Sequence, residues 1–168
     1  MYRKNIQKNL ILVLFSIALF VIISSYTHYR SNKVTHSSSN QVEYYLENIS
    51  EEPILLSRFL NFEWDEVYII GPYTPNKKKH EIVGTTWYTN GTYIGYILDT
   101  YLFYDGEILA DSFQELVFTR NNKVISTALL ERRNGDFLNL EQHVYNSSNA
   151  KFIIEKDEYF FKRVIHSQ

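Results

Sequence analysis

An uncharged apolar run, Leu10–Ile23, constrains this chain more than any other feature. The residues in front of it include three bases: Arg3, Lys4 and Lys8. Ser24–Tyr26 extend the run toward the length of a bilayer-spanning helix. Only Arg30 and Lys33 follow closely, and the more basic flank stays in the cytoplasm, so the N-terminus is predicted to be cytoplasmic. Residues 1–27 are therefore predicted to be a transmembrane signal-anchor, with the C-terminal domain outside the cell membrane.

Two alternatives to a retained, single-pass anchor stay open. The run also has the length of a signal-peptide core, and Ser25 is small enough to precede a cleavage point, which would release a secreted protein. A buried helix of a soluble protein is the third reading. The first two interpretations both export the rest of the chain.

The amino-acid composition limits which kinds of protein the exported part can be. The chain of 168 residues has room for one domain and an appendage. It has no cysteine, which excludes disulfides, thiolate metal sites and a lipidated cysteine anchor. The net charge of -2 argues against nucleic acid as a partner. Its 14 Tyr and 11 Phe favour half-buried strands.

Residues 28–41 are polar, contain three consecutive serines and show no periodicity, so they are predicted to form a flexible linker. Residues 42–168 are predicted to be an extracytoplasmic domain. Its first helix follows from apolar residues at helical spacing: Val42, Tyr45, Leu46 and Ile49. A second turn or helix is expected after Pro53, carrying Ile54 and Phe59.

The next stretch combines a strand and a helix. Val67–Ile70 is short, apolar and stopped by Gly71-Pro72, which indicates a buried strand. Thr74 before Pro75 is a helix start signal, and Gly84 suits the left-handed residue that ends a helix. Between these ends, Lys77, Lys78 and Lys79 are expected to face water. Ile82 and Val83 are expected to face the sheet.

The remainder is predicted to be strands joined by turns. Thr85–Tyr104 is predicted to form a hairpin at Asn90-Gly91, followed by a turn at Asp105-Gly106. Glu115–Thr119 and Val124–Leu130 should pair across Asn121-Asn122. In that register Phe118 faces Ile125 and Thr119 faces Val124.

Near the C-terminus, Asn134–Asp136 is predicted to be a turn, and the polar run Gln142–Asn149 is left without a strand. Phe152–Ile154 and Tyr159–Ile165 should form the last hairpin. The fold class is therefore α+β: an N-terminal transmembrane helix, then short helices packed on a mainly antiparallel sheet.

The motif F-x-W-D-x-V-Y-I-x-G-P-Y-T occupies Phe62–Thr74. A D-S-x-x-x-L-V-F strand at Asp111–Phe118 and an R-x-x-G-D-F segment at Arg132–Phe137 follow it. In this order the chain resembles a group of small, uncharacterised, membrane-anchored bacterial proteins, from Phe62 onward. The group has no assigned activity, so the resemblance implies architecture and location but no catalytic residue.

Signatures of chemistry are weak throughout. Asp65 and Asp136 are candidates for the paired carboxylates of a small envelope hydrolase, although Asp65 is better explained as the acceptor of a backbone hydrogen bond. Ser112 lacks a nucleophile-elbow motif, and no phosphate-binding loop is present. Histidine spacing marks no metal site, and no cofactor is implied.

The hypothesis that fits best is a membrane-tethered extracytoplasmic module with a non-catalytic binding or accessory role. Its partner is expected to be an envelope protein or a cell-wall component, because rigid aromatic residues supply large contact areas. The candidate contact residues are Trp64, Asp65, Tyr73, Trp87 and Tyr93. The alternatives are the carboxylate hydrolase and an immunity or self-protection protein.

Overall fold

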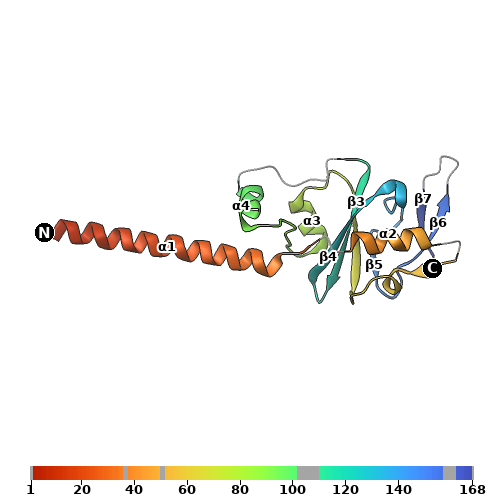
Figure 1. Cartoon of the computed structure of the whole chain (residues 1–168), viewed down its shortest axis with the longest axis horizontal. Coiled ribbons are helices and arrows are strands. Elements are labelled where there is room, and N and C mark those ends of the chain that lie inside the picture. The colour runs from red at the N-terminus through yellow and green to blue at the C-terminus, as the bar shows by residue number, and fades with distance from the viewer. Residues whose placement is uncertain (1, 36–37, 50–51, 102–109, 157–161, 168) are drawn as a thin grey trace.

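A long N-terminal helix projects from a folded α+β domain (Figure 1). The computed structural model describes residues 2–35, 38–49, 52–101, 110–156 and 162–167. Helix α1, Tyr2–Asn32, is about 46 Å long at 1.5 Å per residue. Within the described part of the chain it is the one helix long and apolar enough to cross a membrane, and its apolar section is not covered by the domain.

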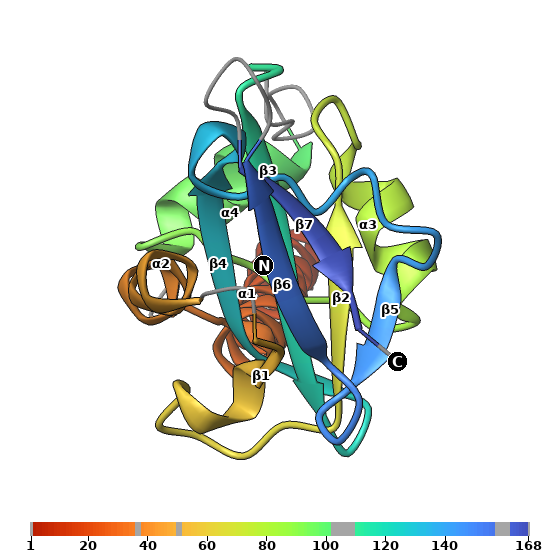
Figure 2. The ribbon, with the colours of Figure 1, turned by 90° about the vertical axis from the view of Figure 1, so that its right-hand side faces the viewer.

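The larger sheet has four antiparallel strands in the order β4-β3-β2-β5. The strands are β2 (Glu66–Ile70), β3 (Phe113–Arg120), β4 (Lys123–Glu131) and β5 (Val144–Asn146). A smaller antiparallel sheet has the order β1-β6-β7. It consists of β1 (Ile54–Leu55), β6 (Lys151–Lys156) and β7 (Lys162–His166). Figure 2 shows β6 and β7 lying across one face of the larger sheet.

The alternation of β-strand side chains divides the core into two clusters, one on each face of the larger sheet. The face toward β6 and β7 holds Leu116, Phe118 and Phe152, and it is also covered by α2 (Ser39–Asn48). The opposite face holds Ile70 and Val117. It is covered by α3 (Asn76–Val83), by Trp87 and by Val34, which follows α1.

The predicted α+β class is confirmed, and so are several local predictions. Gly84 ends α3 with φ 75°, and its N–H donates to the carbonyl of His80. Asn121 and Asn122 adopt left-handed conformations in the β3–β4 turn, with φ 51° and 58°. Thr119 pairs with Val124 as expected.

The register beyond that turn differs from the prediction. Phe118 pairs with Ser126 and not with Ile125, because a β-bulge shifts the register between Phe118 and Thr119. A bulge adds one unpaired residue to one strand, so every pair beyond it moves by one. Sequence alternation alone contains no sign of this extra residue.

The prediction of strands over residues 85–104 is wrong where the structure describes them, because α4 spans Tyr93–Tyr101. The Thr92 hydroxyl accepts a hydrogen bond from Gly95 N–H at 3.1 Å, as a helix-capping residue does. Tyr96 is buried against Tyr29 of α1, with ring centroids 5.2 Å apart. This tertiary packing overrides the strand propensity of the tyrosines. The predicted turn at 105–106 lies outside the described residues.

Helix α3 also differs in detail. Its N-cap is Pro75, and the Thr74 hydroxyl donates to the Gly71 carbonyl at 2.9 Å instead of capping the helix. Ile82 is exposed, whereas Lys79, expected in water, is buried. Val83 is buried as predicted.

The segment predicted to be a flexible linker, residues 28–41, includes the end of one helix and the start of another where the structure describes it. Tyr29–Asn32 belong to α1 and Ser39–Gln41 belong to α2. Between them, Val34 N–H donates to the Tyr88 carbonyl at 2.8 Å. The Ser38 hydroxyl is buried and donates to the Thr127 carbonyl at 3.0 Å.

Two further elements were not expected. The segment after Pro53 contains the expected turn, as a single 3-10 turn, η1 (Leu56–Arg58), but the strand β1 that precedes it was not predicted. The polar run 142–149 contains β5, whose Tyr145 is buried opposite Val67. Tyr145 is the one buried residue of this edge strand, whose Val144 and Asn146 are exposed.

Candidate functional site

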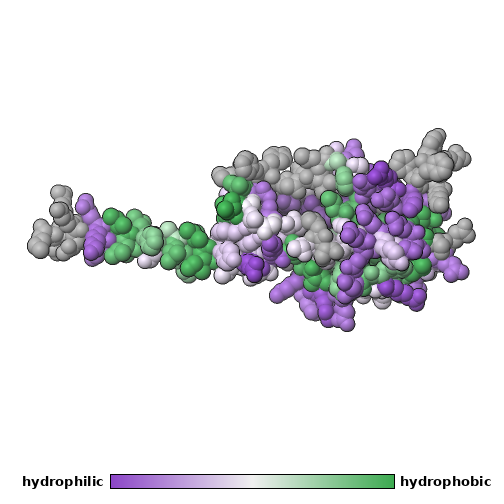
Figure 3. Space-filling view, in the orientation of Figure 1, coloured by the Kyte–Doolittle hydropathy of each residue, from purple (hydrophilic) through white to green (hydrophobic). Residues whose placement is uncertain are grey.

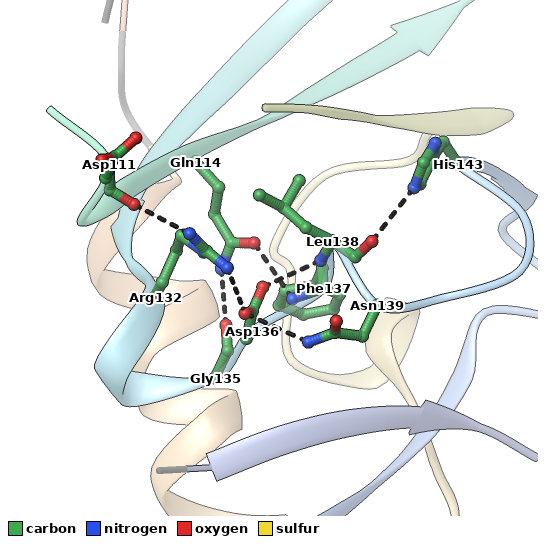
Figure 4. Close-up of polar contacts among 9 residues, drawn as sticks. All are labelled: Asp111, Gln114, Arg132, Gly135, Asp136, Phe137, Leu138, Asn139 and His143. Atoms are coloured by element: carbon green, nitrogen blue, oxygen red, sulfur yellow. Dashed lines mark hydrogen bonds and ion pairs between the residues drawn. The ribbon is translucent and has the colours of Figure 1, made fainter. Parts of the chain in front are cut away.

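A network of polar contacts centres on Asp136, just after the 3-10 turn η2 (Arg132–Asn134) (Figure 4). Its Oδ2 accepts hydrogen bonds from Arg132 Nη2 at 2.6 Å and from Asn139 Nδ2 at 3.2 Å. Its Oδ1 accepts from Leu138 N–H at 3.0 Å. Both carboxylate oxygens of Asp136 therefore have partners, and these hydrogen bonds connect η2 to the loop that follows it.

A buried glutamine forms hydrogen bonds with the backbone of the same loop. Gln114 on β3 is fully buried, donates through Nε2 to the Gly135 carbonyl, and accepts through Oε1 from Phe137 N–H at 3.0 Å. A Cβ on Gly135 would lie 2.8 Å from Leu46 Cδ2, so any larger residue at this turn would force the buried Leu46 side chain to shift. Buried polar groups are costly unless bonded, and here each side-chain function of Gln114 has a backbone partner.

A cavity of about 680 Å³ opens beside the network. Charged and polar residues line it: Asp111, Ser112, Glu131, Arg132, Arg133, Asp136, Asn139, Lys162 and Arg163. Arg133 pairs with Glu131 and Arg132 pairs with Asp136, and the hydrogen bond that Arg132 donates to Asp136 raises the pKa of Arg132. With these pairs formed, Lys162, Arg163 and Asp111 supply the remaining formal charge, so the cavity suits a polar ligand surface of mixed sign.

A second cavity, of about 650 Å³, lies between α3 and the segment that leads into α4. Its wall includes a buried ion pair between Lys79 Nζ and Glu115 Oε2, 2.8 Å apart. His80 Nε2 lies 3.1 Å from the Trp87 carbonyl oxygen. Burial, followed by the neighbouring Tyr96, raises the pKa of Tyr88 to about 12, so its hydroxyl stays protonated at neutral pH.

The five residues predicted to bind a partner lie in different environments. Trp64 and Trp87 are buried in the two core clusters, so neither ring is presented at the surface. Tyr93 is half-buried on α4, against Tyr26 and Tyr29 of α1. Tyr73 is half exposed, in the loop after β2, with an unusual φ of 57°.

Asp65 has a structural role, as its sequence context suggested. Its Oδ2 accepts a hydrogen bond from Asn121 N–H at 2.7 Å, and its backbone N–H donates to the Thr119 carbonyl. The side chain thereby ties the start of β2 to the β3–β4 turn.

Asp65 and Asp136 are not brought together. Asp65 lies beside the turn end of the β3–β4 hairpin, and Asp136 follows Glu131 at the open end, which pairs with Phe113. Phe113 and Thr119 are six residues apart on β3, or about 20 Å. A pair of glycosidase carboxylates needs a separation of about 5–10 Å, so these two acids do not form one.

The described residues contain no group of three or more His, Asp or Glu side chains that could hold a metal ion. His143 Nε2 lies 3.4 Å from the Leu138 carbonyl oxygen, at the edge of the Asp136 network. This contact of His143 is with a backbone carbonyl and adds no acidic side chain to the network.

The sequence signals for the network were present but not assigned a role. Arg132, Gly135 and Asp136 belong to one short motif, in which the four-residue spacing of Arg132 and Asp136 matches an ion pair on a helical turn. Gln114 and Lys79 gave no comparable signal, because their partners are 21 and 36 residues away.

Comparison of the chain with protein-family models, with curated proteins and with solved structures found no match.

Proposed function

We propose that this chain is a single-pass membrane-anchored protein whose extracytoplasmic domain has a non-catalytic binding or accessory role. The observation that carries the proposal is the uncovered apolar surface of α1. Its side chains from Leu10 to Ile23 stand free of the domain, at exposed fractions such as 67% for Phe15 and 72% for Phe20. Apolar surface of this extent is stable in hydrocarbon and not in water.

The orientation follows from the flanking charges. Arg3, Lys4 and Lys8 precede the apolar stretch, and no charged residue occurs between Lys8 and Arg30. The positive-inside rule then assigns the N-terminus to the cytoplasm and the domain to the opposite side.

Tyr73 and the Asp136 cavity support recognition over catalysis. A Cβ built on Gly71 would lie 3.5 Å from the Leu138 side chain, and Leu138 N–H is bonded to Asp136, so the loop that leads to Tyr73 adjoins the polar network. Tyr73 has a left-handed backbone, which is uncommon for a bulky residue and is often a feature of functional positions. Tyr73 does not line the cavity itself, but an exposed aromatic ring on a loop next to a polar network is a typical element of a protein contact.

Photocrosslinking in intact cells tests this assignment. A photoreactive phenylalanine analogue placed at Tyr73 of the full-length protein should capture one recurrent envelope partner. The matched control is the same substitution at Tyr44 of α2, whose exposed fraction of 58% is close to the 50% of Tyr73. Arg163→Glu in the Tyr73 crosslinker background should abolish the capture.

Equal capture at both tyrosines, or none at Tyr73 in abundant folded protein, would contradict recognition through this surface. The anchor is tested separately. The full-length protein should stay with membranes under alkaline carbonate, and added protease should reach the domain only from the extracytoplasmic side.

A further inference from the structure

Helix α4 has an apolar face that nothing in the described part of the domain covers. Ile94 is 71% exposed and Tyr101 is 66% exposed. These residues are seven apart, so they lie on one side of the helix, together with half-buried Ile97 and Leu98. The opposite side carries Tyr96, which is 3% exposed. The side of α4 that faces away from the domain is therefore apolar, whereas a helix that borders water normally exposes polar residues.

The packed side of α4 is attached to α1 at a definite height. Tyr93 meets Tyr26 with ring centroids 5.3 Å apart, and Tyr96 stacks on Tyr29 at 5.2 Å. The Tyr29 hydroxyl donates to the Asn90 carbonyl at 2.9 Å, just before α4. The start of α4 is therefore level with Tyr26 and Tyr29 of α1.

That height corresponds to a membrane surface. The hydrocarbon core of a bilayer is about 30 Å thick, which an α-helix crosses in about 20 residues. A span that begins at Leu10, after the last basic residue of the N-terminal flank, therefore ends near Tyr29, and Arg30 is the first charged residue beyond it. Tyrosine is favoured at such boundaries because its ring is amphipathic.

The apolar face also lies on the correct side of the domain. Figure 3 shows the hydrophobic surface of α4 at the end of the folded part from which α1 projects. With α1 across a bilayer, that end faces the lipid.

We infer that α4 rests in the outer interface of the membrane, with Ile94 and Tyr101 inserted among the lipids. The inference depends on the proposed anchor, since α1 sets the height. The ligand class is a lipid surface, recognised through apolar side chains and an interfacial cluster of tyrosines. Helices that lie in the interface bury one apolar face by about 5–10 Å, which matches this arrangement.

The absence of cysteine makes the test direct, because single cysteines can be introduced for labelling. The full-length protein is reconstituted in phosphatidylcholine–phosphatidylglycerol vesicles with an environment-sensitive fluorophore at Ile94→Cys or Tyr101→Cys. Emission at both positions should shift to the blue, be quenched by nitroxide-bearing lipids and resist aqueous iodide. Near-ultraviolet circular dichroism verifies the fold of each variant.

Three controls make the outcome specific. Thr100→Cys lies on the other side of α4 and Glu155→Cys lies on β6, far from α1, and both labels should be quenched by iodide. Ile17→Cys, within α1, should report hydrocarbon. Iodide quenching at positions 94 and 101, with position 17 in hydrocarbon, would overturn the lipid contact and leave the anchor intact.

Other outcomes also decide the matter. Iodide quenching at position 17 would overturn the anchor and, with it, this inference. Shielding of positions 94 and 101 from both quenchers would show that protein, such as a second copy of the chain, covers α4, and would overturn the lipid assignment. Ile94→Glu should restore iodide quenching at position 101, because a carboxylate resists entry into lipid.

Discussion

Lys79 lies in an environment that its neighbours in the sequence do not suggest. It belongs to a run of three lysines, yet its side chain is 6% exposed and reaches Glu115 of β3, which is 4% exposed. The burial of both charges removes them from water, at a cost that their mutual attraction offsets only when the geometry is good. The pair is therefore a matched unit whose members depend on each other.

Replacement of one partner should be far more harmful than replacement of both. Lys79→Met leaves the Glu115 carboxylate buried and unpaired, which should lower the free energy of unfolding by about 3–5 kcal/mol. Lys79→Met combined with Glu115→Leu should recover most of that loss. Urea unfolding of the full chain in detergent measures the stability of the single and the double variant. Lys78→Met, at an exposed lysine, is the control. Strictly additive effects of the two substitutions would refute the coupling.

Trp64 should prove to be a core residue. It is 4% exposed and meets Phe118 edge-on with centroids 5.4 Å apart. Trp64→Ala should reduce the free energy of unfolding by about 3–5 kcal/mol, because it leaves a cavity in the larger core cluster. Thermal unfolding measures this change. An unaltered melting temperature would show that the indole contributes no packing energy.

Tyr68 gives the chain a specific response to alkaline pH. Burial, and then its hydrogen bond to Glu66, raise the pKa of Tyr68 to about 12, against the usual value of about 10. Because the folded pKa is the higher one, this stabilisation is complete below pH 10 and is lost as the pH rises through 12. Tyr68→Phe should therefore make the alkaline decline in stability shallower.

Phenolate absorbance checks the same assignment. Glu66→Gln removes the carboxylate that opposes the ionisation of Tyr68, so the pKa of Tyr68 should move down toward 10. Unchanged titration in Glu66→Gln would mean that burial alone sets this pKa.

At the scale of elements, the end of α3 shows how a single backbone angle defines a boundary. Gly84→Ala places a Cβ in open space, since no atom lies within 4 Å, but keeps the left-handed φ of 75°. The substitution should cost about 1 kcal/mol from backbone strain alone. Gly91→Ala also meets no atom and has no positive φ, so it is the matched control and should be nearly neutral. Denaturant unfolding of the two variants separates strain from contact, and equal losses would argue against the strain.

The elements that could be predicted are those whose signals are local. Gly71-Pro72, Gly84 and Asn121-Asn122 act through their own backbone angles, so β2, the end of α3 and the β3–β4 turn were recognisable. The α4 segment was not, because tyrosine and isoleucine favour strands in isolation and the deciding contact is with Tyr29, over 60 residues earlier. β5 was missed because its partner strand supplies most of its order.

At the scale of the whole molecule, the join between α1 and the domain is structured. Lys33 forms an isolated bridge with Tyr88, and Tyr88 N–H donates to the Asn32 carbonyl at 2.9 Å. Val34 is buried in the smaller core cluster beside Trp87. Residues 32–34 of the predicted linker are thus packed on the domain.

A shortened domain should reveal this dependence. A version that begins at Val42 lacks Val34, the Ser38 hydrogen bonds and the first turn of α2, so it should be about 3 kcal/mol less stable than one that begins at Thr27. Thermal unfolding of the two purified domains tests this. Equal melting temperatures would mean that residues 27–41 are only a tether.

The candidate site could be predicted in part only. The motif that contains Arg132 and Asp136 was visible, and their ion pair is local. Gln114 bonds the loop of Gly135 from β3, and Lys162 and Arg163 line the cavity from β7; only the tertiary fold brings these strands to one place. Trp64 and Trp87 stood out by residue type, yet their large apolar surfaces are used inside the two cores.

The attachment of the end of α1 to the domain, through Asn32 and Val34, has a mechanical consequence. A domain on a flexible tether sweeps a large volume and meets targets at many heights, whereas this one is held by a helix that continues to Asn32 and by bonds to Tyr88. With α1 in a bilayer, as proposed, Tyr73 and the Asp136 cavity would be presented at a constant distance from the lipid. Any tilt or rotation of α1 would be transmitted directly to them, so the anchor would act as a lever as well as an attachment.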